Sequence, residues 1–165
     1  MEIALLVIDM QRAFFEGAVK TSMTEASKII NEVVDLFREH KKKVIWIYHE
    51  NPKIDLTREK ENFKVISLLK PKKEEETVIK RYGNSFNKTG LYEYLAREKI
   101  NTLILTGYRA ERCLLSTYRG ALDLDLAPIM LKGALAGGNP EYIKLTEDLC
   151  EIISPGALGE FLKYK

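Results

Sequence analysis

Six short apolar runs, separated by segments with helical periodicity, constrain the fold of this chain more than any other feature. The first run, IALLVI at 3–8, is apolar throughout, as expected for a strand buried on both faces. Such strands alternating with amphipathic helices indicate a parallel sheet covered by helices on both sides. We therefore predict one α/β domain over residues 1–165. The predicted strands are 3–8, 43–48, 77–80, 101–107, 127–131 and 151–153.

The segments between these runs predict the helices. Ser22 with Glu25 three residues later is typical of a capping box at a helix start. Asn139 and Ser154, each followed by a proline, are also favourable helix starts. The polar segment 51–76 allows only a short helix near 58–68. The predicted helices are 22–40, 89–99, 111–125, 140–150 and a short one after 155.

Charge and composition argue against several classes of function. The 26 basic and 24 acidic residues leave a net charge of +2, and no dense basic stripe is present, so we expect no nucleic-acid partner. No apolar run is long enough for a membrane span, and the apolar start is too short for a signal peptide. Two cysteines fit a reduced protein better than a disulfide scaffold. We therefore expect a cytoplasmic protein without a membrane partner.

Polar residues stand where the predicted strands end, and open parallel sheets bind ligands at that edge. Asp9 follows the first strand, His49 the second, and Lys80 ends the third. A carboxylate after a buried strand is costly unless it is paired or capping a loop. A lysine there is often simply a residue leaving the sheet. These residues alone leave both the functional and the structural interpretations open.

Cys113 lies in TGYRAERCLLST, just after the fourth predicted strand. A free cysteine is commonly a small buried apolar residue, and this is our interpretation of Cys150. Cys113 differs because it lies near a helix start, where free N–H groups and partial positive charge stabilise a thiolate or an oxyanion. Asp9 and Lys80 end other strands of the same edge, so the three side chains can converge.

Three segments, in order along the chain, resemble the isochorismatase-like cysteine hydrolase family, which includes nicotinamidases and N-carbamoylsarcosine amidases. They are ALLVIDMQRAFF with Asp9, VIKRYGNSFNKTGLYEYL with Lys80, and LILTGYRAERCLLSTYRGALDLD with Cys113. The resemblance covers roughly residues 3–135. It implies a three-layer α/β/α, Rossmann-like fold and an Asp9–Lys80–Cys113 triad. It also implies a cis peptide at Tyr108–Arg109 and an oxyanion hole formed by the backbone N–H groups of Arg109 and Cys113.

The chain also departs from the family pattern. The Asp-x-His metal motif of nicotinamidases is missing, so we expect no metal and no cofactor, with His49 near the pocket instead. Arg109 and Arg112 place unusual charge around the cysteine. They could lower its pKa, bind an anionic substrate or simply face solvent. Among the aromatic residues, Phe14 and Tyr108 are the candidates for the pocket lining.

The leading hypothesis is a metal-independent cysteine hydrolase that cleaves a C–N bond of a small amide, carbamoyl or ureido compound through a thioester. The cysteine favours this chemistry, because isochorismatases proper act on a vinyl ether and lack it. The alternative is a non-catalytic relative that uses the fold as an interaction or scaffold domain. The resemblance further implies a homo-oligomer, either a dimer or a tetramer.

Overall fold

The fold is a six-stranded parallel sheet with the strand order β3-β2-β1-β4-β5-β6. The structure is a computed structural model that describes residues 2–164. It contains all six predicted strands, and β1 lies between β2 and β4 in the middle of the sheet. Continuous apolar sequence here produces a strand that is buried on both faces. The strands are β1 (Glu2–Ile8), β2 (Lys43–His49), β3 (Glu76–Lys80), β4 (Ile100–Tyr108), β5 (Ala127–Ala136) and β6 (Ile152–Ile153).

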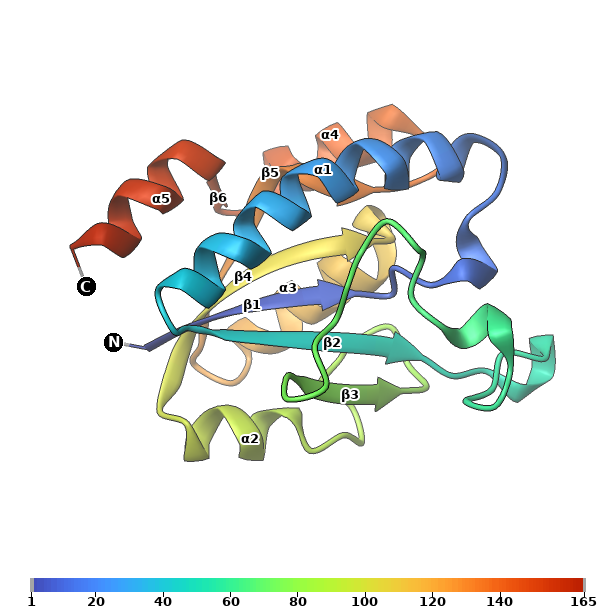
Figure 1. Ribbon diagram of the computed structural model, residues 1–165, viewed down its shortest axis with the longest axis horizontal. Helices are drawn as coiled ribbons and strands as arrows, with labels where there is room; N and C mark the ends of the chain where they lie inside the picture. Colours follow the sequence, from blue (N-terminus) through green and yellow to red (C-terminus); the bar gives the residue numbers. More distant parts are fainter. Residues whose placement is uncertain (1, 165) are drawn as a thin grey trace.

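Helices cover both faces of the sheet, which gives the expected three layers (Figure 1). Two hydrophobic clusters fill the space between layers: α1 and α5 pack on one face, and α2 and α3 on the other. Asn139 and Ser154 cap α4 and α5 with their side chains, as predicted. The helices are α1 (Gly17–Glu39), α2 (Leu91–Arg97), α3 (Leu115–Leu122), α4 (Pro140–Leu149) and α5 (Pro155–Lys163).

Three local predictions were wrong. The first helix begins at Gly17 rather than at residue 22, and Ser22 accepts a hydrogen bond from the N–H of Gly137 instead of capping α1. Val19 packs against the core, which extends the amphipathic face towards the N-terminus beyond the supposed capping box. Cys150 lies just after α4 and is only half-buried.

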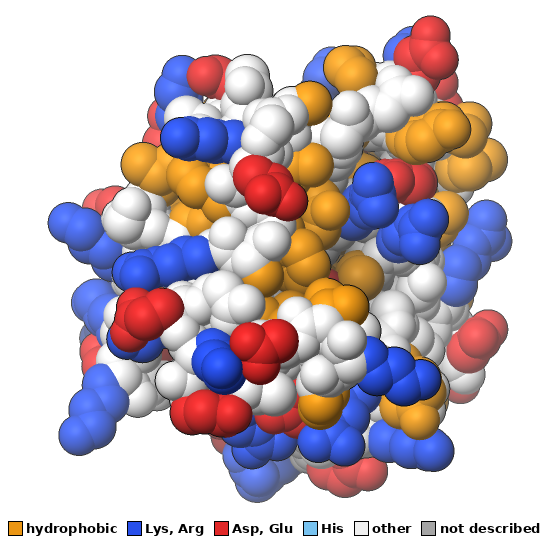
Figure 2. Space-filling model, turned by 90° about the vertical axis from the view of Figure 1, so that its right-hand side faces the viewer, with side chains coloured by type: hydrophobic (Ala, Val, Ile, Leu, Met, Phe, Trp, Pro, Cys, Tyr) orange, Lys and Arg blue, Asp and Glu red, His pale blue; other side chains and the backbone are white. Residues whose placement is uncertain are grey.

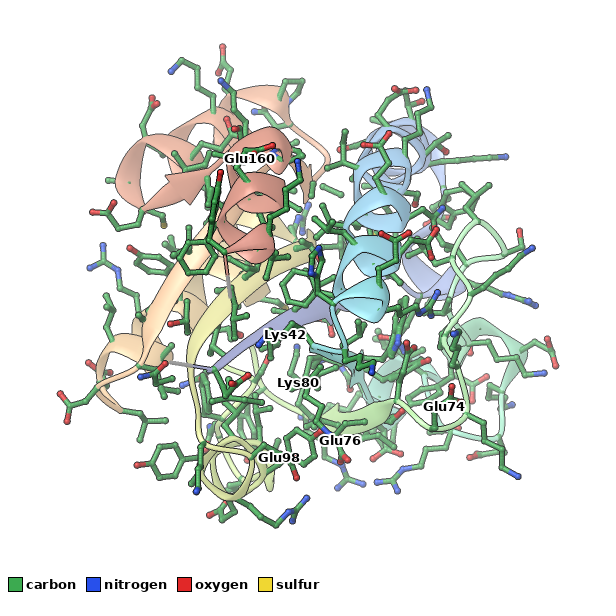
Figure 3. All side chains as sticks on the ribbon, turned by 60° about the vertical axis from the view of Figure 1, so that its left-hand side comes forward. Lys42, Glu74, Glu76, Lys80, Glu98 and Glu160 are labelled. Atoms are coloured by element: carbon green, nitrogen blue, oxygen red, sulfur yellow. The ribbon has the colours of Figure 1, made fainter. Side chains whose placement is uncertain are left out.

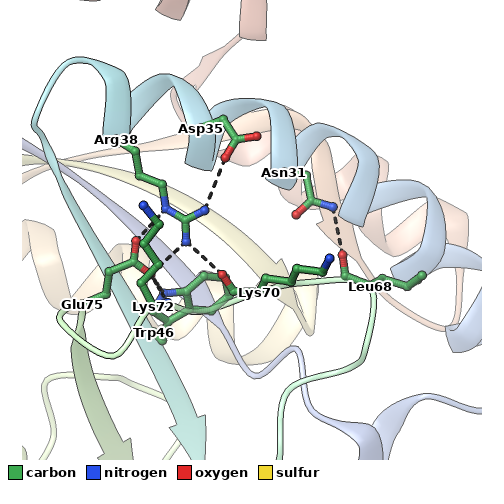
Figure 4. A network of polar contacts seen from close by, with 8 residues as sticks. All are labelled: Asn31, Asp35, Arg38, Trp46, Leu68, Lys70, Lys72 and Glu75. Atoms are coloured by element: carbon green, nitrogen blue, oxygen red, sulfur yellow. Dashed lines mark hydrogen bonds and ion pairs between the residues drawn. The ribbon is translucent and has the colours of Figure 1, made fainter.

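The segment 58–68 forms only a three-residue 3-10 turn, Glu61–Phe63, within the long connection from β2 to β3. A polar network between α1 and β2 holds the end of this connection (Figure 4). The carboxylate of Glu75 accepts hydrogen bonds from Arg38 Nε at 2.8 Å, Trp46 Nε1 at 2.7 Å and the N–H of Lys72 at 2.8 Å. These bonds attach the end of the connection, just before β3, to α1 and β2.

The two ends of the sheet differ in character. The amino end is closed by ion pairs between charged side chains, including Lys42 with Glu2 at 3.0 Å and Lys43 with Glu98 at 3.2 Å (Figure 3 labels Lys42 and Glu98). The carboxyl end is hollowed, with hydrophobic side chains at the floor and Lys and Arg side chains beside it (Figure 2). The polar residues that follow the strands meet at this second end.

Candidate active site

Asp9 and Lys80 form an ion pair at the carboxyl end of the sheet. Lys80 Nζ lies 2.7 Å from Asp9 Oδ2, and the two side chains are 0% and 1% exposed. The pair spans β2, because Asp9 follows β1 whereas Lys80 ends β3. Asp9 also has a φ of 51°, a left-handed conformation that non-glycine residues adopt rarely and often at functional positions. An aspartate that only caps a loop and a lysine that only leaves the sheet, the two structural interpretations left open by the sequence, do not describe this buried pair.

Lys80 is held by more than Asp9. Its ammonium also donates to the carbonyl oxygen of Tyr82 at 3.1 Å and lies 3.5 Å from Nδ1 of His49. An ammonium has only donors, so Nδ1 is the acceptor and the ring proton of His49 is on Nε2. Burial, followed by the positive charge of Lys80, lowers the pKa of His49 below its usual value. The imidazole is therefore neutral at pH 7.

Cys113 lies in a short π-helical turn, Ala110–Leu114, that leads into α3. Its thiol lies close enough to Asp9 and Lys80 for hydrogen bonding with both to affect its pKa. Burial first, and then the negative charge of Asp9, raise the pKa of Cys113 to about 12, although Lys80 opposes them. The resting sulfur is therefore a thiol, whereas the sequence pattern predicts that the helix start stabilises a thiolate.

The two carboxylate oxygens of Asp9 differ in their contacts. Oδ2 accepts from Lys80, whereas Oδ1 is buried and forms no hydrogen bond of standard geometry with any described residue. A buried acceptor without a hydrogen-bond partner is costly, so the unsatisfied Oδ1 atom calls for an explanation. The thiol of Cys113 is close enough to Asp9 for hydrogen bonding between them to affect its pKa, so the carboxylate stands beside a group that can donate a proton.

The turn before Cys113 approaches Asp9 because residue 107 is glycine. Gly107 has a φ of 114°, and a Cβ there would lie 2.1 Å from the carbonyl oxygen of Ile8. Only glycine permits this approach of β4 to the end of β1. The peptide bond Tyr108–Arg109, one residue further on, is cis, the isomer that the resemblance implies. The N–H of Arg109 donates to no other residue between 2 and 164, so it is free to bind an oxyanion.

These residues open into a cavity of about 520 Å³, called here the catalytic cavity. Phe14, His49, Tyr108 and Arg112, the four residues predicted to contact substrate, all line it. Phe14 and Tyr108 stack with their ring centres 5.0 Å apart. Sequence reasoning missed other lining residues, because nothing local marks them. They are Ile54, Gly83, Glu111 and Ser116.

Arg109 and Arg112 have different surroundings. Arg109 Nε lies 2.9 Å from Glu111 Oε1, and the guanidinium lies over the ring of Tyr108 at 5.8 Å. The pair is misaligned for a hydrogen bond, and Glu111 Oε2 is buried without a partner among the described residues. The side chain of Arg112 is exposed and forms neither an ion pair nor a hydrogen bond within the part of the chain that the structure describes, whereas its backbone N–H donates to the carbonyl oxygen of Arg109. Arg112 is therefore the cation available to a ligand.

Buried polar side chains hold the loops around the cavity. Gln11 donates to the carbonyl oxygen of His49 at 3.0 Å and accepts from its N–H at 2.8 Å. Ser85 and Thr117 bond each other at 2.8 Å and tie the loop after Lys80 to α3. Sequence reasoning did not assign these supporting roles, although Gln11 and Thr117 occur in the motifs quoted above.

Comparison with known proteins agrees with this geometry. The family model of the isochorismatase domain matches residues 3–146. The chain belongs to the isochorismatase family. Among relatives within it, an uncharacterised isochorismatase family protein, YrdC of Bacillus subtilis, is 29% identical over 136 residues, which cover 81% of this chain and 73% of that protein. This membership supports a hydrolase activity.

Solved structures of isochorismatase-like proteins share the fold. A cysteine hydrolase from Pseudomonas syringae pv. phaseolicola aligns with a TM-score of 0.90 at 20% identity, covering 99% of this chain and 93% of the other. N-carbamoylsarcosine amidase from Thermoplasma acidophilum aligns with a TM-score of 0.82 at 21% identity, covering 94% and 97%. At these identities the alignments show the common fold alone.

The donor set in this isochorismatase family member does not fit a metal site. Among residues 2–164 no group of three or more His, Cys, Asp or Glu side chains is arranged to hold a metal ion. His49 directs Nδ1 towards the ammonium of Lys80, which would repel a second cation. Metal independence stays a prediction. None of the described helices has the length and apolarity needed to cross a membrane.

Proposed function

We propose that the protein is a cysteine hydrolase that cleaves a C–N bond of a small amide, carbamoyl or ureido compound without a metal ion. The observation that carries this proposal is the buried contact of Asp9 with Lys80 beside Cys113, with Asp9 Oδ1 left without a partner. This arrangement brings a nucleophile and a base together at the cavity and a cation directly behind them, which the chemistry requires.

Acylation begins with the resting thiol. As the sulfur of Cys113 attacks the substrate carbonyl carbon, its proton passes to Oδ1 of Asp9. The carbonyl oxygen becomes an oxyanion, which the backbone N–H groups of Arg109 and Cys113 bind. Asp9 then returns the proton to the leaving nitrogen, the C–N bond breaks, and an amine or ammonia departs from the thioester.

Deacylation uses the same groups. Asp9 takes a proton from a water molecule that attacks the thioester carbonyl, and the departing sulfur regains a proton as the acid is released. Lys80 remains an ammonium throughout and balances the charge of Asp9 between proton transfers. His49, neutral and with its Nε2 proton free, is placed to donate a hydrogen bond to the substrate.

The cavity also suggests the substrate class. A volume of about 520 Å³ suits a small molecule. Phe14 and Tyr108 offer an apolar wall, and Arg112 offers an uncommitted guanidinium, so a carboxylate on the substrate would have a partner. We therefore propose a small amide that carries an anionic group.

A screen of small amides with the wild type, Cys113→Ala and Cys150→Ala tests this function through released ammonia. We expect turnover of at least one carboxylate-bearing amide by the wild type and by Cys150→Ala, and none by Cys113→Ala. Turnover that persists in Cys113→Ala would show that Cys113 is not the nucleophile.

The raised pKa of Cys113 favours a second candidate, a non-catalytic protein that uses this fold for interactions. A thiol that never ionises would be inert. Inertness across the amide panel, together with an alkylation rate of Cys113 that does not change when an amide is added, would support this candidate over the hydrolase.

A further inference from the structure

A second cavity of about 430 Å³ opens beside the ends of β2 and β3, and it shares no lining residue with the catalytic cavity. Its wall consists mostly of long polar side chains from the segments that follow the two strands. The lining residues are Glu50, Arg58, Ile79, Arg81, Tyr82, Asn87 and Lys88. The hydrolase chemistry proposed above uses none of them as a reacting group.

Glu50 organises this cavity. Its side chain is 7% exposed, yet those of Arg58 and Arg81 are 61% and 64% exposed. Oε1 accepts from Arg58 Nε at 2.9 Å, while Oε2 accepts from Arg81 Nε at 3.0 Å and lies 2.9 Å from Nη2. Hydrogen bonding from Arg58 is the main cause that lowers the pKa of Glu50, and Arg81 adds to it. Burial of the carboxylate has the opposite, smaller effect. One ionised carboxylate thus orients two guanidinium groups whose outer edges reach solvent.

The positive charge of the cavity exceeds what Glu50 balances. Lys88 contributes a third cation, with Nζ 3.3 Å from the hydroxyl of Tyr82 and 5.3 Å from the centre of its ring. Three cations therefore face one carboxylate around the hollow. Neither terminal nitrogen of Arg58 donates to any other residue in the range 2–164. Fixed guanidinium donors with unused N–H groups suit an oxyanion with several oxygens, and arginine pairs with phosphate through two parallel bonds.

We propose that the second cavity binds the phosphoryl group of a small molecule. A dianionic phosphoryl group would neutralise the charge excess, and its oxygens would accept from Arg58, Arg81 and Lys88. The site lies next to the catalytic pair: the N–H of Glu50 donates to the carbonyl oxygen of Lys80 at 2.8 Å, and the carbonyl of Tyr82 accepts from Lys80 Nζ. The phosphoryl group would therefore bind outside the cavity that holds Cys113.

Titration with pyrophosphate, at constant ionic strength, tests the site by calorimetry and by backbone amide NMR shifts. We expect saturable binding by the wild type, with shifts concentrated at Glu50, Arg58 and residues 81–88. We expect Arg58→Gln and Lys88→Gln each to weaken binding about tenfold, which is roughly 1.4 kcal/mol. Arg97→Gln is the matched control, because Arg97 is equally exposed and pairs with Glu98 away from this cavity.

The Arg58→Gln variant removes a partner of the buried Glu50 and could fail to fold. Lys88 does not contact Glu50, so Lys88→Gln still tests the site in that case. Absence of saturable binding, equal affinity in Lys88→Gln and the wild type, or shifts confined to Arg109–Cys113 would each overturn the proposal. These readouts do not involve turnover, so they are independent of whether the protein is a hydrolase.

Discussion

Lys80 Nζ contacts Asp9 Oδ2 at 2.7 Å across β2, and neither side chain reaches solvent. Two charges can remain so deeply buried only as a pair, because either alone would be desolvated without compensation. Oδ1 of Asp9 is buried and has no hydrogen-bond partner among residues 2–164, so it is the oxygen that we propose as the base. Stability and the proposed activity therefore depend on the same two residues in different ways.

Removing one member of this pair should destabilise the protein more than removing both. We expect Lys80→Met to lower the free energy of unfolding by about 3–5 kcal/mol, because a buried carboxylate then lacks its partner. The double variant Asp9→Asn/Lys80→Met should recover much of that loss but no turnover. Urea denaturation and ammonia release measure the two effects. A double variant less stable than Lys80→Met would contradict this interpretation of the pair.

Asp9 should control the ionisation of Cys113 as well as turnover. Its negative charge raises the pKa of Cys113, so Asp9→Asn should lower that pKa and speed alkylation by iodoacetamide at pH 8 while abolishing turnover. The measurement uses a Cys150→Ala background so that one thiol reacts. Circular dichroism confirms that the variant is folded. Slower alkylation in Asp9→Asn would show that the carboxylate does not act on the sulfur.

Glu75 should make stability depend on pH. Although burial raises its pKa, hydrogen bonds from Arg38, the N–H of Lys72 and Trp46 give a net lowering in the folded state. A lowered folded pKa means that the stabilisation is present above the unfolded pKa and is lost as pH falls through the folded pKa. We expect Glu75→Gln to cost about 1.5–3 kcal/mol at pH 7. This difference should shrink in acid, as unfolding curves at several pH values can show.

Arg112 should discriminate between substrates by charge. We expect Arg112→Gln to raise KM about tenfold for a carboxylate-bearing amide, which is roughly 1.4 kcal/mol, with little effect on a neutral amide of the same size. Arg119→Gln serves as the control, because Arg119 is an exposed arginine of α3 that does not line the cavity. An equal effect on both substrates would mean that Arg112 supports the turn and does not bind an anion.

The homo-oligomer implied by the family resemblance stays a prediction. The exposed face of α4 is the surface that we propose for it, since Tyr142, Leu145 and Leu149 are 48%, 52% and 50% exposed at helical spacing. We expect the wild type to elute as a dimer or tetramer in light-scattering chromatography, and Leu145→Glu to shift it towards the monomer. Elution of both proteins as monomers would end this assignment.

Much of the fold follows from local pattern. The run at 3–8 is apolar at every position and the run at 101–107 has an apolar centre, Leu103–Leu105, so both are typical of central strands, and the residues after them meet at one edge. For that reason the sequence alone allowed the choice of three candidate site residues, namely Asp9, Lys80 and Cys113. The start of α1 could not be predicted in this way. Val19 packs against the core and extends the helix towards the N-terminus, and the capping pattern of Ser22 and Glu25 gives no sign of that contact.

The sequence by itself therefore determined the strands, their order along the chain and the candidate residues at their ends, because periodicity and turn chemistry are local. Only the tertiary structure decided the electrostatics. It pairs Arg109 with Glu111 and leaves Arg112 free, keeps Cys113 protonated beside Asp9, and gathers Arg58, Arg81 and Lys88 around Glu50. Charges interact through space, and partners such as Glu50 and Arg81 or Asp9 and Cys113 are far apart along the chain, so no local pattern encodes which of them are neutralised.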